Sequence, residues 1–156
     1  MGQVLLGERV SERLVLVVVP AGTLALVDLI VKARVPTAWW AFHHRSHDWV
    51  VLSLVLLAGT LALALVRSRA VALAAGVMCG GVIGNLVSAR HDHDWVPNPL
   101  TIGNYRTGVA FNLADVFFLV GNLLLMAALI VVTLRNRHRL IPPRGWERAL
   151  RRRLRS

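Results

Sequence analysis

Four long runs of apolar residues constrain the fold of this 156-residue chain more than any other feature. The runs cover about 14–33, 49–66, 70–88 and 111–134. A helix needs roughly 20 apolar residues to cross about 30 Å of hydrocarbon, and each run approaches that length. We therefore expect an all-α integral membrane protein: a four-transmembrane-helix bundle with a partly irregular outer loop in residues 1–135, followed by a basic tail in residues 136–156.

The positive charges indicate the orientation of this bundle. The net charge is +10, and nine arginines follow Leu134. By the positive-inside rule, three regions face the cytoplasm: this tail, the stretch with Arg9 and Arg13, and the turn with Arg67 and Arg69. Both termini are then cytoplasmic, and residues 34–48 and 88–110 face outward. The tail is expected to rest on the anionic headgroups of membrane lipids. We expect no nucleic-acid partner, because no aromatic residue for base stacking other than Trp146 is interleaved with the arginines.

Polar residues interrupt the apolar runs near the ends that are predicted to face outward. Charged groups in hydrocarbon are energetically costly, so they usually pair with one another or belong to a functional site. The six residues concerned come from three different runs: Asp28, Lys32, Asn85, Arg90, Asn112 and Asp115. We expect them to converge in one pocket below the outer headgroups.

The spacing of these residues leaves two interpretations open. Asp28 and Lys32 are four residues apart and share one helical face, as in a buried salt bridge. Asn112 and Asp115 are three apart and project toward one neighbour. A structural membrane subunit would let Asp28, Lys32 and Asp115 satisfy only one another. A site that binds or cuts a polar group would leave a carboxylate facing a cleft.

Glycines recur every four residues in the third run. Gly76, Gly80 and Gly84 fall along one ridge of a helix, where a neighbouring backbone can approach closely. Gly84 directly precedes Asn85, so close packing at this point is expected to hold the amide inside the bundle.

The polar strings resemble a known family. GNLVSAR at 84–90 and AFNLAD at 110–115 are similar to the signatures GNxxDR and FNxAD of signal peptidase II, the lipoprotein signal peptidase. Asp28 and Lys32, in DLIVK, match its DxxxK signature. The resemblance implies an aspartic endopeptidase of the bacterial cytoplasmic (inner) membrane, without metal or other cofactor. Its partner would be the signal peptide of lipid-modified prolipoproteins, which such enzymes cleave at the outer face of the membrane.

The same resemblance assigns roles to individual residues. Asp115 matches one catalytic aspartate of a pair that shares one proton. The residues that match substrate-binding or supporting positions are Asp28, Lys32, Asn85, Arg90 and Asn112.

The match departs from the family pattern at the second aspartate. The Asp of GNxxDR is missing, and Ser88 and Ala89 stand before Arg90, as if one residue were inserted. Counting eight residues on from Arg90, as the family pattern does, leads to Asn98. One alternative is that Asp92 or Asp94 completes the dyad. The other is a catalytically inactive relic that binds lipidated peptide or lipid.

Two histidine-rich loops suggest a different class of function. His43, His44 and His47 lie in the first outward segment, and His91 and His93 alternate with Asp92 and Asp94 in the second. Imidazoles and carboxylates at this spacing are ligands for Zn²⁺ or Cu²⁺. The alternatives are a membrane protein that binds a transition metal and a solvated, pH-sensitive loop.

Overall fold

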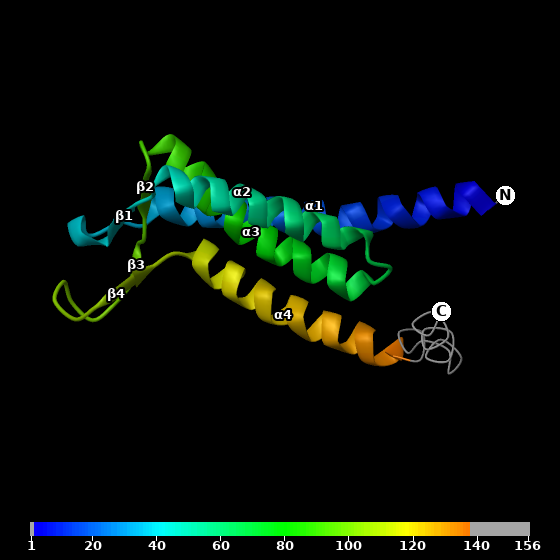
Figure 1. The fold of residues 1–156 in the computed structure, drawn as a ribbon. Helices are drawn as coiled ribbons and strands as arrows, with labels where there is room; N and C mark the ends of the chain where they lie inside the picture. Colours follow the sequence, from blue (N-terminus) through cyan, green and yellow to red (C-terminus); the bar gives the residue numbers. More distant parts are fainter. Residues whose placement is uncertain (1, 138–156) are drawn as a thin grey trace, which may run out of the picture.

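The computed structural model of the chain describes residues 2–137 and is mostly helical (Figure 1). The helices are α1 (Gly2–Arg34), α2 (His47–Ala62), α3 (Arg69–His91) and α4 (Leu113–Arg135), with the 3-10 helices η1 (Trp39–Ala41) and η2 (Leu63–Leu65). The arginine-rich tail, apart from its first residues, lies outside the described residues.

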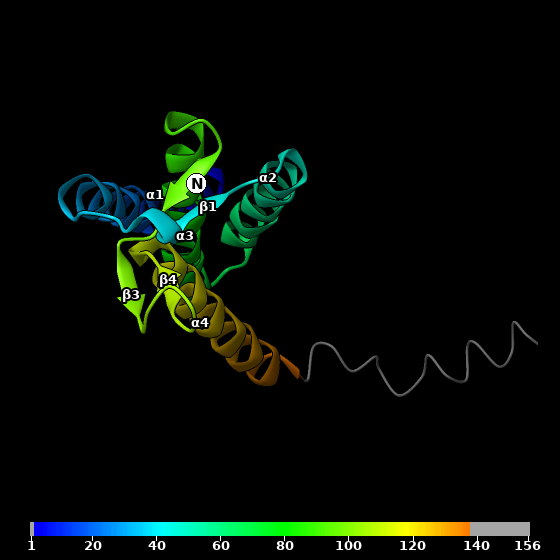
Figure 2. The same ribbon diagram turned by 90° about the vertical axis from the view of Figure 1, so that its left-hand side faces the viewer.

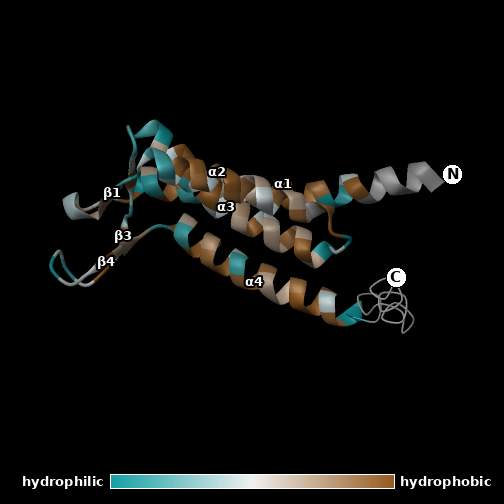
Figure 3. Cartoon of the chain, viewed as in Figure 1, coloured by the Kyte–Doolittle hydropathy of each residue, from teal (hydrophilic) through white to brown (hydrophobic). Residues whose placement is uncertain are grey.

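Three of the described helices are long and apolar enough to cross a membrane: Val10–Arg34 of α1, Arg69–His91 and Leu113–Arg135. In the region of the second expected span, α2 has 16 residues and is followed directly by the three residues of η2. Hydrophobic residues cover most of the helix surfaces, while the hydrophilic ones gather toward the helix ends (Figure 3).

Helix α3 lies at the centre of the bundle. Seen along the helix axes, α1, α2 and α4 surround it (Figure 2). Its apolar window is 67% buried, compared with 22% for α1 and 11% for α4. The beginning of α1 and the end of α4 lie at one end of the bundle, and all the strands lie at the other (Figure 1). We call the strand-bearing end the polar end.

The glycine ridge of α3 faces α1. A Cβ on Gly76 would lie 2.7 Å from the carbonyl oxygen of Val17, and one on Gly80 would lie 2.9 Å from Leu24 Cβ. One turn further on, a Cβ on Gly84 would lie 2.7 Å from Asp28 Oδ2. The small residues therefore set how closely α1 approaches α3, up to the point where the polar side chains begin.

Two short antiparallel strand pairs cover the polar end. β1 (Phe42–His44) pairs with β2 (Trp95–Pro97), and His43 stands opposite Val96. β3 (Leu100–Ile102) pairs with β4 (Val109–Phe111), and Leu100 stands opposite Phe111. Asn98 precedes the second hairpin and Asn112 follows it. The hairpin therefore brings these two asparagines together, while the first pair brings Asn98 beside β1.

Candidate functional site

Polar side chains from three helices and one loop form a single hydrogen-bonded group at the polar end. We call it the polar cluster, and it comprises Asp28, Lys32, Asn85, Asn98, Asn112 and Asp115.

Asp28 and Lys32 form a buried ion pair on α1. Lys32 Nζ lies 2.7 Å from Asp28 Oδ2, and the two side chains are 4% and 0% exposed. Asp28 Oδ1 also accepts a hydrogen bond of 2.8 Å from the backbone N–H of Ala114. That N–H belongs to the first turn of α4, where helix donors have no intrahelical acceptor. Asp28 therefore fixes the start of α4 against α1.

Asn85 connects the ion pair to Asp115. Its Oδ1 accepts from Lys32 Nζ at 3.0 Å and from Asn112 Nδ2 at 3.0 Å. Its Nδ2 donates to Asp115 Oδ1 at 2.9 Å. Since the adjacent Gly84 lets α1 approach closely, the single amide can reach side chains of both α1 and α4.

Asn112 and Asp115 form a capping box at the start of α4. Asn112 Oδ1 accepts from the backbone N–H of Asp115 at 3.0 Å, and Asp115 Oδ2 accepts from the N–H of Asn112 at 3.2 Å. This reciprocal arrangement satisfies two helix-end donors. It also fixes the orientation of the Asn112 amide, because a backbone N–H can only donate, so Oδ1 must face it.

The fixed orientation of Asn112 determines the remaining hydrogen-bond directions. Asn112 Nδ2 donates to Asn98 Oδ1 at 2.5 Å, so Asn98 Nδ2 faces His43 Nδ1 at 2.7 Å. An amide nitrogen is a donor, and His43 Nδ1 must therefore be the acceptor, with the ring proton on Nε2. The Asn98 side chain is fully buried, and both of its polar atoms are bonded.

A pocket of about 260 Å³ opens beside Asp115, between α2, α3 and α4. Asp115 is half-buried and is the only carboxylate among its lining residues. Arg45 lies at the pocket with its guanidinium 4.8 Å from the ring centroid of Trp49. A purely structural network would be closed on itself. This cluster is open at Asp115, because the Asp115 side chain lines a cavity.

Arg90 does not join the polar cluster. Helix α3 continues without interruption to His91, so the residue that seemed inserted before Arg90 is accommodated within the helix. At 3.6 residues per turn, Arg90 points about 140° away from Asn85. It is exposed, whereas Ala89, four residues after Asn85, is buried.

Asp92 and Asp94 also lie outside the cluster. Asp92 caps the end of α3, and Asp94 is exposed, with a positive φ of 70°. Of the candidate positions for a second aspartate, only Asn98 is bonded to the cluster. Its contact with His43 could not be found from the sequence pattern, since it depends on the pairing of two three-residue strands.

The described part of the chain, residues 2–137, shows no group of three or more histidine, cysteine or acidic residues placed to hold a metal ion. His43 bonds Asn98, and His44 contacts Trp95 edge to face at a centroid distance of 5.3 Å.

The fold and the cluster together define a class: a helical membrane protein with a polar site at one end, in which Asp28 is buried in an ion pair and Asp115 lines a pocket. The chain belongs to the signal peptidase (SPase) II family, because the sequence model of that family matches residues 12–131. The match includes every residue of the polar cluster. No curated protein and no solved structure gives a significant match. Family membership supports a lipoprotein signal peptidase-like function and aspartic-type chemistry.

Proposed function

We propose that this chain binds the signal peptide of lipid-modified prolipoproteins at the outer face of the bacterial cytoplasmic membrane, and that Asp115 is its surviving catalytic carboxylate. The observation that carries the proposal is the position of Asp115. It lines a pocket of about 260 Å³, while the Asn85 side chain and the Asn112 backbone N–H each donate to one of its two oxygens. Family membership provides the substrate class.

The pocket fits an extended peptide segment that enters from the bilayer. Its wall is largely apolar, with Leu52, Leu56, Val82 and Phe118 below the polar groups. A signal peptide could therefore lay apolar side chains between α2, α3 and α4 and present one amide bond near Asp115.

In this mechanism Asp115 acts as a general base. Its carboxylate takes a proton from water while the water oxygen adds to the peptide carbonyl carbon. Asp115, now protonated, gives that proton to the amine nitrogen as the C–N bond breaks. In a two-aspartate site the second carboxyl group donates a proton to the carbonyl oxygen as the water adds. Asn98 cannot do so, because an amide does not exchange protons in this pH range. We expect hydrolysis slower by about 10²- to 10⁴-fold than with a positioned acid.

The second candidate function is a relic that binds the lipidated peptide without cutting it. The complete hydrogen bonding of Asn98 favours this alternative. The oxygen and the nitrogen of this amide each have a hydrogen-bond partner, Asn112 and His43.

We also propose that α2 together with η2 is the fourth span, with both termini in the cytoplasm. Sixteen α-helical and three 3-10 residues extend roughly 30 Å at about 1.5 and 2.0 Å per residue. The arginines of the tail would then contact anionic headgroups of the inner leaflet. Bacterial inner-membrane localisation follows from the substrate class.

The test uses purified protein in nanodiscs and a prolipoprotein peptide with or without the diacylglyceryl group. We expect binding of the lipidated peptide only, and cleavage that Asp115→Asn abolishes. Asp48→Asn is the matched control, since Asp48 is exposed in the first turn of α2. If the wild type binds the lipidated peptide without cleaving it, the result would support the second function, that of an inactive relic. Failure to bind the lipidated peptide would refute both functions.

A further inference from the structure

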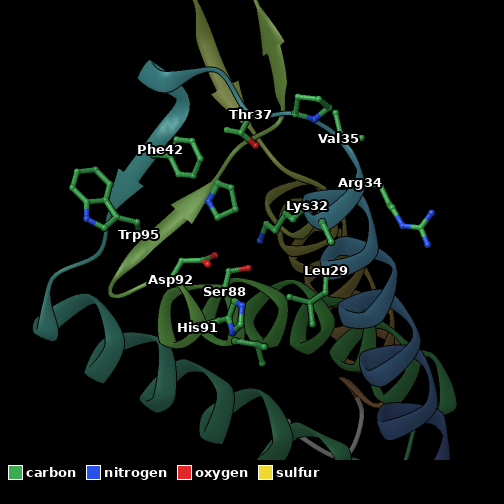
Figure 4. Close-up of a pocket in the computed structure, with 14 residues that line it drawn as sticks. Leu29, Lys32, Arg34, Val35, Thr37, Phe42, Ser88, His91, Asp92 and Trp95 are labelled. Atoms are coloured by element: carbon green, nitrogen blue, oxygen red, sulfur yellow. The ribbon is translucent and has the colours of Figure 1, made fainter.

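A second and larger pocket of about 780 Å³ lies at the polar end, between the end of α1, the end of α3 and strands β1 and β2 (Figure 4). It shares no lining residue with the pocket beside Asp115. The Lys32–Asn85 hydrogen bond joins the two, since Lys32 lines the larger pocket and Asn85 the smaller.

Lys32 offers this pocket one hydrogen-bond donor. An ammonium group has three protons. Within residues 2–137 it has two partners, Asp28 Oδ2 at 2.7 Å and Asn85 Oδ1 at 3.0 Å. Figure 4 shows the Lys32 side chain directed into the cavity, with the Ser88 hydroxyl also facing it. The third proton and the hydroxyl are suited to the oxygens of a phosphate group.

Asp92 supplies an opposite charge to the same cavity. Its carboxylate is directed into the pocket (Figure 4). In the described part of the chain it forms no ion pair, so it lies beyond salt-bridge distance of Lys32. A pocket that keeps a cationic donor and a carboxylate apart is complementary to a ligand that carries both charges.

The walls of the pocket place it at a membrane surface. Leu29 and Val87, from the apolar helices α1 and α3, line it, and both helices end beside it. Trp95 and Phe42 close the opposite side. Tryptophan at the end of a membrane span is typical of the headgroup layer.

We propose that this pocket binds the headgroup of a phospholipid that carries phosphoethanolamine. The phosphate accepts from Lys32 Nζ and the Ser88 hydroxyl, and the primary ammonium donates to Asp92. The acyl chains run down the apolar surface beside Leu29 and Val87. A primary ammonium fits better than a quaternary one, because only the former can donate a hydrogen bond to the carboxylate. The proposal does not depend on peptide binding or cleavage.

The experiment measures lipid retention by native mass spectrometry. Protein is reconstituted with equal amounts of phosphatidylethanolamine, phosphatidylcholine and phosphatidylglycerol, and the lipids that remain bound are counted. We expect phosphatidylethanolamine to be retained about tenfold over phosphatidylcholine, the effect of one charge-assisted hydrogen bond. Asp92→Asn should abolish this preference, and Ser88→Ala should reduce retention of all three lipids.

Asp94→Asn is the matched control. Asp94 does not line the pocket, and asparagine tolerates its positive φ. Glycerophosphoethanolamine, which lacks acyl chains, should compete only weakly if the ligand is a lipid; competition at equal concentration would indicate a soluble ligand and overturn the proposal. Equal retention of the three lipids by the wild type, or preference for phosphatidylglycerol, would also overturn it. So would a preference that survives Asp92→Asn.

Discussion

An Asn98→Asp substitution puts a carboxylate at the position that we predict to correspond to the second aspartate of the family. The Asn112 hydrogen bond would persist, because a carboxylate oxygen can replace Asn98 Oδ1 as the acceptor. The other oxygen would face His43 Nδ1, which in the wild type accepts from the amide at 2.7 Å. Two acceptors cannot share this contact without a proton. The imidazole can supply this proton from Nδ1, either by moving its ring proton from Nε2 to Nδ1 or by binding a second proton. In both forms it donates to the new carboxylate and favours the charged form of that carboxylate.

This pairing limits the catalytic gain from the substitution. A second carboxyl group donates a proton to the carbonyl oxygen only if it carries one. A charge-assisted hydrogen bond contributes about 1.5–3 kcal/mol, and 1.36 kcal/mol corresponds to a tenfold change in protonation equilibrium. Pairing with His43 should therefore lower the protonated fraction of the carboxyl group at position 98 roughly 10- to 100-fold. We expect Asn98→Asp combined with His43→Val to cleave faster than Asn98→Asp alone by about that factor.

The assay follows cleavage of a diacylglyceryl-modified prolipoprotein peptide in nanodiscs at several pH values. His44→Val is the matched control, because His44 lies on the same strand and contacts Trp95 rather than Asn98. Equal rates for the single and double variants, with both folded, would refute the role given to His43. No gain in either background would contradict the placement of the second carboxylate at position 98.

Three further substitutions test the packing of the cluster by thermal unfolding in detergent. Gly84→Ala should destabilise the protein by about 1–3 kcal/mol, because its Cβ would lie 2.7 Å from Asp28 Oδ2; Gly22→Ala, with nothing within 4 Å, should not. Lys32→Met should lower the free energy of unfolding by about 3–5 kcal/mol, because it leaves Asp28 charged and without its partner. Adding Asp28→Asn should recover much of that loss, and no recovery would contradict the pairing. Asn112→Ala should cost at least about 1 kcal/mol, the usual effect of losing a helix N-cap; an unchanged midpoint would show that the capping box is dispensable.

The sequence predicts the helical parts of this structure well, because apolar runs and glycine spacing depend on local periodicity. The ridge of Gly76, Gly80 and Gly84 faces α1, as close backbone packing requires. The capping box is also a local feature: Asn112 and Asp115 are three residues apart, and their bonds lie within one helical turn.

The parts that could not be predicted depend on contacts between distant segments or on helix phase. Arg90 matches the family string in letters, but an unbroken α3 turns it away from Asn85. The partner of Asn98, His43, is 55 residues away and is brought near by a three-residue strand pair with no sequence signal of its own. The length of α2 also differs from its apolar run, since the last residues of that run tighten into a 3-10 turn.

Asn98 and His43 are best understood as a matched pair. The amide accepts from Asn112 with its oxygen and donates to imidazole with its nitrogen, so each atom of the buried group has a partner. A carboxylate at position 98 would keep the first of these bonds, but the second would then need a proton on His43 Nδ1 instead of Nε2. Conversely, an imidazole beside a catalytic carboxylate would compete for the proton that the reaction needs. The histidine thus accommodates the asparagine and disfavours a protonated carboxyl group in its place, so a proton donor at position 98 is expected to need a change at position 43 as well.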